Sequence, residues 1–249
     1  MAALSSSNPQ VIEQTEDGYR YSIEPFLLAD FVNLQTDSRV LDVGTGCGII
    51  PLLLATRGII EEIVAIEIQK SLYDLAVKNV LRNGASDKVR LVYGDFVNVK
   101  LDLKDRLFDI VISNPPYRKL NTGRMNPNQE KAIARHELSM DLKSLTARTN
   151  NFLKNGGIFT LAYPPMRLTE VLEHLCAYKL FPTRLRFIHS SQKTEARIFL
   201  IDAVKGHRSD CIIEPPLYIY NEDGSYSKEM EKIYASFNYF SRPHHVEKE

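Results

Sequence analysis

The stretch Leu107–Tyr117 (LFDIVISNPPY) says most about how this chain folds. Its first seven residues are mostly apolar, as in a parallel strand that is buried on both faces of its sheet. Two prolines then end the strand, because proline has a fixed φ angle and no backbone N–H to donate. Asn114 and Tyr117 are therefore predicted at the carboxyl end of a strand, where ligands bind in open α/β sheets. An amide, an unused backbone carbonyl and an aromatic ring in that position suit a planar group that carries an NH2.

Strand and helix patterns alternate on both sides of this stretch, which predicts a parallel sheet with right-handed helical crossovers. The last two strands have only a short connection, so the last one is expected to be antiparallel. This is the α/β, Rossmann-like fold of class I S-adenosylmethionine-dependent methyltransferases, with a mostly parallel seven-stranded sheet and an antiparallel last strand. The expected strands are Arg39–Val43, Glu62–Ile68, Val89–Tyr93, Leu107–Ser113, Ile158–Tyr163, Leu185–His189 and Ala196–Val204. The expected helices are Ile49–Thr56, Ser71–Asn83, Leu138–Leu153 and Pro165–Tyr178.

Composition and charge limit the possible classes of function. The 249 residues are enough for one large α/β domain or at most two small ones. Lys plus Arg and Asp plus Glu number 31 each, so there is no overall basic field and any nucleic-acid contact must be local. The three cysteines are widely spaced, which fits a reducing cytosol better than a disulfide framework or a metal site. No segment approaches the ~18 apolar residues of a membrane span, and we expect a cytoplasmic monomer without a bound metal.

We expect one methyltransferase domain over residues 18–249. Residues 1–17 show no secretory signal and are expected to be disordered. Residues 18–38 would form an N-terminal cap before the first strand, and residues 205–249 a C-terminal extension after the last. The polar stretch from Arg118 to Ala134 is predicted as a long loop beside the Asn-Pro-Pro-Tyr sequence, and long loops in such places are often lids or substrate clamps.

A glycine-rich turn, Leu41–Gly48 (LDVGTGCG), lies between the first expected strand and helix. Its glycines permit positive φ angles and let a ligand approach the backbone closely, although a tight strand-to-helix turn has the same composition. The G-x-G-x-G spacing differs from that of dinucleotide-binding proteins, which argues against NAD. Taken singly, an acidic residue after a strand is more often a loop cap or a solvated charge. Acidic residues at the ends of successive strands together indicate an S-adenosylmethionine cleft, with cofactor contacts expected from Asp42, Gly44, Thr45, Gly46, Gly48, Glu67, Ile68, Asp95, Phe96 and Asn114.

The Asn-Pro-Pro-Tyr sequence has the groups that methylation of a conjugated amine requires. Such a nitrogen is a poor nucleophile, because its lone pair is delocalised into a π system. The Asn114 amide oxygen and the Pro115 carbonyl can each accept one N–H, while Pro116 fixes the turn and Tyr117 stacks on the acceptor plane. Methyl transfer then needs in-line positioning more than a strong base. The alternative is a turn that an asparagine initiates, in which the prolines only end the strand.

The sequence resembles the tRNA1(Val) adenine N6-methyltransferase family over about residues 18 to 240. That resemblance implies methylation of the adenine beside the anticodon, tRNA as partner, and a cofactor cap from Arg20 and Tyr21. One departure is the sequence Glu24-Pro25-Phe26, where an aspartate is expected before the Leu-Leu pair. The segments that carry the resemblance are Asp17–Ser22, Leu27–Ala29, Asp42–Gly48, Ala65–Ile68, Ile112–Tyr117, Ala134–Glu137, Gly156-Gly157 and Tyr226-Ser227.

Two sets of basic residues are candidates for phosphate contacts, although a solvated face is the usual role of such charges. Several amino-methyltransferase families share the Asn-Pro-Pro-Tyr sequence. The rival functions are therefore glutamine N5-methylation of a protein, another RNA or DNA amino-methylation, and a non-catalytic RNA-binding module. The first basic set, expected to bind substrate together with Tyr117, is Arg118, Lys119, Arg124 and Arg135. The second set, near the last two strands, is Arg184, Arg186, Lys193 and Arg197.

Overall fold

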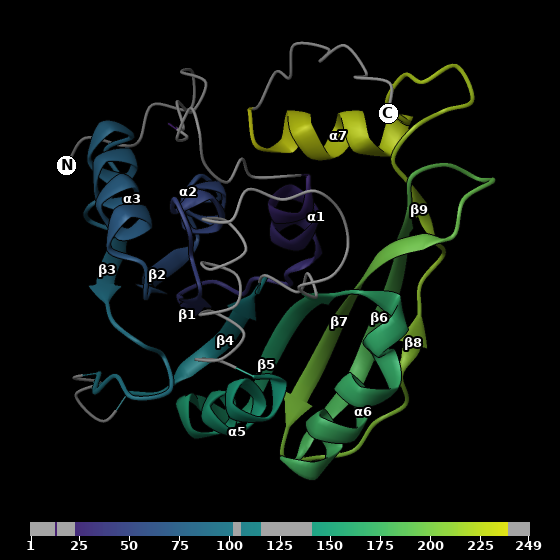
Figure 1. Ribbon diagram of the computed structural model, residues 1–249. Coiled ribbons are helices and arrows are strands. Elements are labelled where there is room, and N and C mark those ends of the chain that lie inside the picture. The colour runs from purple at the N-terminus through teal and green to yellow at the C-terminus, as the bar shows by residue number, and fades with distance from the viewer. Residues whose placement is uncertain (1–12, 14–22, 102–105, 116–140, 239–249) are drawn as a thin grey trace, which may run out of the picture.

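The computed structural model describes residue 13 and residues 23–101, 106–115 and 141–238. These residues form three layers, with a twisted sheet between two layers of helices (Figure 1). The strand order is β3-β2-β1-β4-β5-β7-β6-β8, and β9 pairs with β6. The strands are β1 (Ser38–Val43), β2 (Ile60–Glu67), β3 (Val89–Tyr93), β4 (Phe108–Ser113), β5 (Leu153–Tyr163), β6 (Leu180–His189), β7 (Ala196–Lys205), β8 (Ile212–Ile213) and β9 (Leu217–Tyr218).

The predicted α/β fold is confirmed, including the antiparallel last strand. The strands β1 to β5 are parallel to one another, while β7 runs antiparallel to both β5 and β6. To the seven strands predicted, the structure adds β8 and β9, which are too short to leave a pattern in the sequence. Two predicted boundaries were wrong by five residues. β5 begins at Leu153 because the Asn155–Gly157 turn is absorbed as an irregularity in its pairing with β4, and β6 begins at Leu180 because Leu180 and Phe181 already pair with Lys205 and Val204 of β7.

Three of the described helices begin at a residue that suits a helix start. Gly48 adopts a positive φ of 82° directly before α2, and the side chains of Asp141 and Ser227 accept backbone N–H groups at the starts of α5 and α7. The helices are α1 (Glu24–Phe31), α2 (Ile49–Ala55), α3 (Lys70–Arg82), α5 (Leu142–Phe152), α6 (Leu168–Ala177), α7 (Lys228–Ser236) and the 3-10 helix η1 (Pro165–Arg167).

The sheet is covered by a separate hydrophobic core on each face. One core contains buried residues of α1, α2 and α7, such as Leu28, Leu53 and Met230. The other contains residues of α5 and α6, such as Leu145 and Leu175. Because β1 and β4 are covered on both faces, their side chains are almost all buried, as the apolar run before Asn114 predicted. The central strands thus form a rigid frame for whatever lies at their ends.

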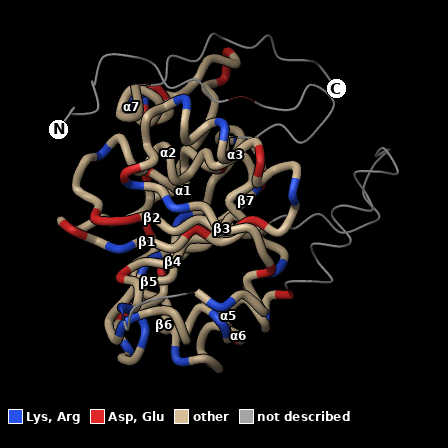
Figure 2. The backbone as a smooth tube through the Cα atoms, turned by 90° about the vertical axis from the view of Figure 1, so that its left-hand side faces the viewer, with Lys and Arg blue, Asp and Glu red and all other residues tan. Residues whose placement is uncertain are grey.

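Charged residues of both signs are interspersed over all three layers of the described backbone (Figure 2). This distribution agrees with a net charge of zero for the whole chain. None of the helices in the described ranges is long and apolar enough to cross a membrane.

Candidate active site

Three of the predicted site motifs meet at one edge of the sheet, where β1, β2 and β4 end. Val43 of β1 is in register with Ile66 of β2 on one side and with Ser113 of β4 on the other. The glycine turn after β1, Glu67 at the end of β2 and Asn114 after β4 are therefore neighbours. This edge lies at the carboxyl ends of parallel strands, as in other α/β proteins that bind ligands there.

The glycine loop, residues 44–48, is open on one side and tightly packed on the other. Gly44 and Gly46 have φ angles of 75° and 61°, and a Cβ at either position would meet no described atom within 4 Å. A Cβ at Gly48 would instead lie 3.3 Å from the Cβ of Ala76 in α3. The loop therefore leaves room at the sheet edge for a ligand, while α3 supports it from behind.

Asp42 is a fully buried carboxylate without donors. Its exposed fraction is 0%, and among the described residues neither of its oxygens has a hydrogen-bond partner. Burial raises the pKa of Asp42 to about 7, the Thr45 hydroxyl opposes this rise, and the negative charge of Glu67 adds to it. Asp42 and Thr45 nevertheless make no hydrogen bond of normal geometry, and the Thr45 hydroxyl is also without a partner in the described part of the chain. Such unsatisfied groups are costly in an interior, so they point to a missing ligand.

Glu67 is held against the glycine loop by two backbone bonds. Its Oε2 accepts the Gly46 N–H at an N–O distance of 2.9 Å, and its Oε1 accepts the Gln69 N–H at 2.7 Å. The residue is 1% exposed, while the adjoining Ile68 is half-buried. A carboxylate oxygen can accept more than one hydrogen bond. Glu67 thus brings to the sheet edge a group that suits hydroxyl donors.

Asp95 and Phe96 follow β3, and only the first of them presents a polar group. Asp95 caps its own turn, because its Oδ1 accepts the Val97 N–H at 2.9 Å. The ring of Phe96 is 3% exposed and packs on Phe152, with a centroid separation of 5.6 Å. The predicted hydrogen bond from an adenine amine to Asp95 and the predicted packing of Phe96 on the base both stay predictions, and the burial of Phe96 leaves little of its ring for such a contact.

Asn114 has a buried amide oxygen that meets no donor in the described part of the chain. The residue is half-buried, yet its Oδ1 is fully buried and has no partner among the described residues. Ser113, the preceding residue, is fully buried and donates its hydroxyl to the Val43 carbonyl at 3.0 Å, which ties β4 to β1 just before both strands end. Pro115 is also buried. The start of the Asn-Pro-Pro-Tyr sequence is thus firmly placed, with an acceptor unused.

Several predicted site residues lie outside the described residues, and their roles stay predictions. These are Arg20, Tyr21, Pro116, Tyr117, Arg118, Lys119, Arg124 and Arg135.

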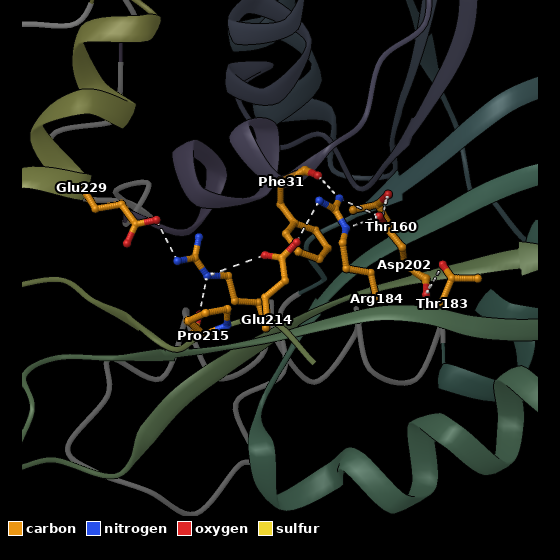
Figure 3. Close-up of polar contacts among 9 residues, drawn as sticks. Phe31, Thr160, Thr183, Arg184, Asp202, Glu214, Pro215 and Glu229 are labelled. Atoms are coloured by element: carbon orange, nitrogen blue, oxygen red, sulfur yellow. Dashed lines mark hydrogen bonds and ion pairs between the residues drawn. The ribbon is translucent and has the colours of Figure 1, made fainter. Parts of the chain in front are cut away.

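The second basic set divides into two kinds of residue. Arg184 and Arg186 belong to a polar cluster between α1, β6, β7 and α7, which we call the Arg184 cluster (Figure 3). Arg184 Nη2 lies 2.7 Å from Asp202 Oδ2, and Arg186 Nη2 lies 2.7 Å from Glu229 Oε1. These two arginines therefore bind the protein's own carboxylates. Lys193 and Arg197, by contrast, are exposed.

The Arg184 cluster holds the N-terminal helix α1 to the sheet. Arg184 donates to the Phe31 carbonyl at the end of α1, and its guanidinium carbon lies 3.8 Å from the centroid of the Phe31 ring. Asp202 also accepts the Thr160 hydroxyl at 2.7 Å. Burial raises the pKa of Asp202, although the charge of Arg184 opposes this rise.

We expect Asp202→Ala to lower the free energy of unfolding by about 3 kcal/mol, because it leaves a largely buried guanidinium without its main counter-charge. Lys193→Ala is the matched control, because its ion pair with Glu222 is almost fully exposed and should contribute less than about 0.5 kcal/mol. Urea unfolding of both variants measures this difference. A loss below about 1 kcal/mol in Asp202→Ala would contradict the role of the cluster.

A cavity of about 70 Å³ adjoins the Arg184 cluster, with Leu27 and Asp30 in its lining. None of the described residues that line it belongs to the carboxyl edge of β1, β2 and β4. It is also small beside the ~300–1,000 Å³ of typical ligand sites. We therefore regard it as a packing gap rather than as the binding site.

Sequence analysis missed two side chains that support the site. Arg148 of α5 donates to the Val99 carbonyl at 2.7 Å, which fixes the turn that follows Asp95. Asn79 of α3 is fully buried and donates to the Cys47 carbonyl in the glycine loop at 2.9 Å. A signal for Asn79 was present, because it lies three residues after Ala76 on the apolar face of its helix, where an amide is unusual.

The three layers and this strand order define a Rossmann-like fold. The glycine loop after β1, the acidic residue that ends β2 and the one that follows β3 are typical of methyltransferases with this fold. The sequence matches the methyltransferase small domain family over residues 25–174, and the chain belongs to this family.

Comparisons with individual proteins agree with this assignment. A tRNA1(Val) (adenine(37)-N6)-methyltransferase from Dyadobacter fermentans is 26% identical over 216 residues, which cover 86% of this chain and 87% of that protein. A protein of the same name from Bacteroides thetaiotaomicron is 33% identical over 159 residues, or 64% of this chain and 65% of that protein. The crystal structure of a predicted O-methyltransferase from Agrobacterium tumefaciens superposes with a TM-score of 0.68 at 18% identity, covering 88% of this chain and 99% of that structure. The likeness to that structure shows the fold.

Proposed function

We propose that this protein transfers a methyl group from S-adenosylmethionine to the N6 amine of an adenine in tRNA, at the position beside the anticodon. The observation that carries the proposal is the buried Oδ1 of Asn114 at the carboxyl end of β4, which has no hydrogen-bond partner among the described residues. It lies beside an edge where Asp42 and Glu67 present acceptors to a ligand.

The described residues fit S-adenosylmethionine. Within the described ranges, the polar atoms at the sheet edge without a hydrogen-bond partner are the two oxygens of Asp42, the Thr45 hydroxyl and the Asn114 amide oxygen, and all can accept a hydrogen bond. The cofactor brings an ammonium group, two ribose hydroxyls, an adenine amine and a positive sulfonium. Glu67 would hold the ribose hydroxyls and Asp95 the adenine amine, while Asp42 would accept donors near the charged end. A dinucleotide with two negative phosphates suits this acidic edge less well.

The chain's own residues would prepare the acceptor nitrogen for attack. When bound, the cofactor supplies an electrophilic methyl group on its sulfonium. Asn114 Oδ1 and the Pro115 carbonyl would each accept one N–H of the adenine amine. These bonds draw the nitrogen out of conjugation and aim its lone pair, so that most of the catalytic effect is positioning. Because the proton can leave the nitrogen after the methyl transfer, the reaction needs no strong base.

The choice of tRNA as substrate rests on the relatives and on the chemistry of an unpaired loop. Both relatives described above are named as tRNA1(Val) adenine methyltransferases. An adenine in a loop can be splayed out at low unstacking cost and brought to Asn114. With zero net charge, the protein would hold the RNA through few phosphates, for which Arg118, Lys119, Arg124 and Arg135 are candidates.

The decisive measurement is mass spectrometry of tRNA nucleosides from cells with and without this protein. We expect N6-methyladenosine to disappear from one tRNA when the protein is absent, and to return when the wild-type gene is restored. Restoring an Asn114→Ala gene is the matched control and should leave the adenine unmodified. Unchanged N6-methyladenosine, with loss of methylglutamine from a protein instead, would favour the rival protein methyltransferase. Loss of neither mark would favour the non-catalytic RNA-binding module.

A further inference from the structure

The amide of Asn79 links two parts of the chain that are far apart in sequence. Its Nδ2 donates to the Cys47 carbonyl at 2.9 Å and to the Glu13 carbonyl at 3.1 Å. Its Oδ1 accepts the Glu13 N–H at 2.9 Å. One side chain of α3 therefore holds the glycine loop on one side and a residue of the N-terminal segment on the other.

The orientation of this amide follows from its partners. Two carbonyl oxygens face Nδ2 and one N–H faces Oδ1, so the reversed amide would oppose like groups at all three contacts. Asn79 is 0% exposed, and a buried amide is costly unless it is hydrogen-bonded. A helix interior also favours many residues over asparagine. The residue is therefore explained by the three bonds that it makes, and each of them holds backbone.

On the side of the glycine loop, Asn79 acts next to groups that we assign to the cofactor. Cys47 lies between Gly46, whose N–H is bound to Glu67, and Gly48, which packs against Ala76. Gly44 and Thr45 both donate to the Ile66 carbonyl at 3.0 Å, which secures the start of the loop to β2. The bond from Asn79 secures its other half to α3. A shift of the Cys47 carbonyl would thus move the Gly46 N–H and the Glu67 carboxylate together.

On the other side, the Asn79 amide pairs with the backbone N–H and carbonyl of Glu13, as the backbone of a neighbouring strand would. The paired N–H and carbonyl of Glu13 bind the two ends of one amide. The Glu13 carboxylate also pairs with Arg82, one turn further along α3. The backbone bonds engage the fully buried amide of Asn79, whereas the ion pair with Arg82 is about half exposed.

From this geometry we infer that Asn79 is a positioning residue for cofactor binding, and that it couples the glycine loop to Glu13. This inference rests on the proposed function, because it takes the glycine loop as the cofactor site. Coupling through a shared amide is reciprocal, so docking of Glu13 and binding of the cofactor strengthen each other.

The test compares four variants by calorimetric titration with S-adenosylhomocysteine, at a temperature where all are folded. Glu13→Pro removes the N–H that Asn79 accepts, and Glu13→Ala is its matched control, because it loses only the ion pair with Arg82. Asn79→Asp removes both donors. Asn83→Ala is the control on the same helix, since the Asn83 amide donates to the Asn79 backbone carbonyl within α3. We expect affinity to fall about fivefold in Glu13→Pro and at least about tenfold in Asn79→Asp, with both alanine variants close to wild type.

Hydrogen exchange of residues 44–48 in the cofactor-free protein gives a second readout. Exchange should be faster in Glu13→Pro than in Glu13→Ala. The proline variant loses the N–H that helps to orient the Asn79 amide, and this amide holds the Cys47 carbonyl. Equal affinity and equal exchange in these two variants would overturn the coupling. Wild-type affinity in Asn79→Asp, with only a lower melting temperature, would reduce Asn79 to a structural role. If the wild-type protein bound neither form of the cofactor, the proposed function would fail, while the exchange comparison would still decide the coupling.

Discussion

Replacing Asn114 with alanine should reduce turnover by at least about 100-fold and change cofactor affinity by less than about threefold. The reason is that the buried Oδ1 of Asn114 has no hydrogen-bond partner among the described residues, as expected for an acceptor that binds the substrate amine. In the proposed reaction it accepts an N–H of the adenine amine and acts most strongly as that nitrogen becomes tetrahedral. Its loss should therefore appear in kcat rather than in binding. Single-turnover methylation of a tRNA transcript measures the chemical step directly.

The neighbouring Ser113 provides a control for this prediction. Ser113→Ala removes a buried hydroxyl that donates to the Val43 carbonyl, which should lower stability by about 1 kcal/mol without touching the acceptor nitrogen. Turnover of this variant, measured below its melting temperature, should stay close to wild type. Wild-type turnover in Asn114→Ala would show that the acceptor site lies elsewhere.

Cofactor binding should depend on pH through Asp42. Burial raises the pKa of its carboxyl to about 7, and the ionised form attracts a cationic ligand and accepts its donors more strongly than the protonated form does. Affinity for S-adenosylmethionine should therefore fall about tenfold from pH 8 to pH 6, as the fraction of ionised Asp42 falls. In Asp42→Asn the affinity should be weak at both pH values. Calorimetry at pH 6, 7 and 8 measures the affinity of both proteins. The cofactor's own amine titrates equally in both experiments, so it does not contribute to the difference between them.

The same carboxylate should destabilise the cofactor-free protein. The pKa of Asp42 is higher in the folded state than its ordinary value of 3.8, so the folded state binds a proton more tightly than the unfolded state does. Stability is then lost as pH rises from about 4 to about 7 and stays low above that range. Asp42→Asn, which removes the buried charge, should be more stable than wild type at pH 8 by about 2–4 kcal/mol.

A second aspartate serves as the control for both effects of Asp42. Asp109 lies in β4, away from the carboxyl edge, and its Oδ1 pairs with Lys154 Nζ at 2.6 Å. Partners hold the pKa of Asp109 below its usual value despite its partial burial. Asp109→Asn should bind the cofactor like wild type and should be less stable at pH 8. Equal effects of the two substitutions on affinity would contradict the role of Asp42.

Much of the sheet and of its site could be predicted, because the signals lie in short stretches of chain. The apolar run before Asn114, the prolines after it and the glycine spacing after Asp42 each fix a local conformation. Placing them at one edge needed only the rule that parallel strands end on the same side. Boundaries failed where a tertiary contact extended a strand, as at Leu153 in β5 and Leu180 in β6.

What the sequence determined by itself was the fold class and the motifs at the carboxyl edge, since both depend on residue types at fixed short spacings. The tertiary structure decided which polar groups are satisfied. Arg184 proved to bind Asp202, and Asn79 to bind Cys47 and Glu13, while Asp42 has no donor among the residues that the structure describes. These outcomes depend on which residues, distant in sequence, are brought within hydrogen-bonding distance and away from water. No local pattern encodes that, because burial and partnership arise only when the strands and helices pack together.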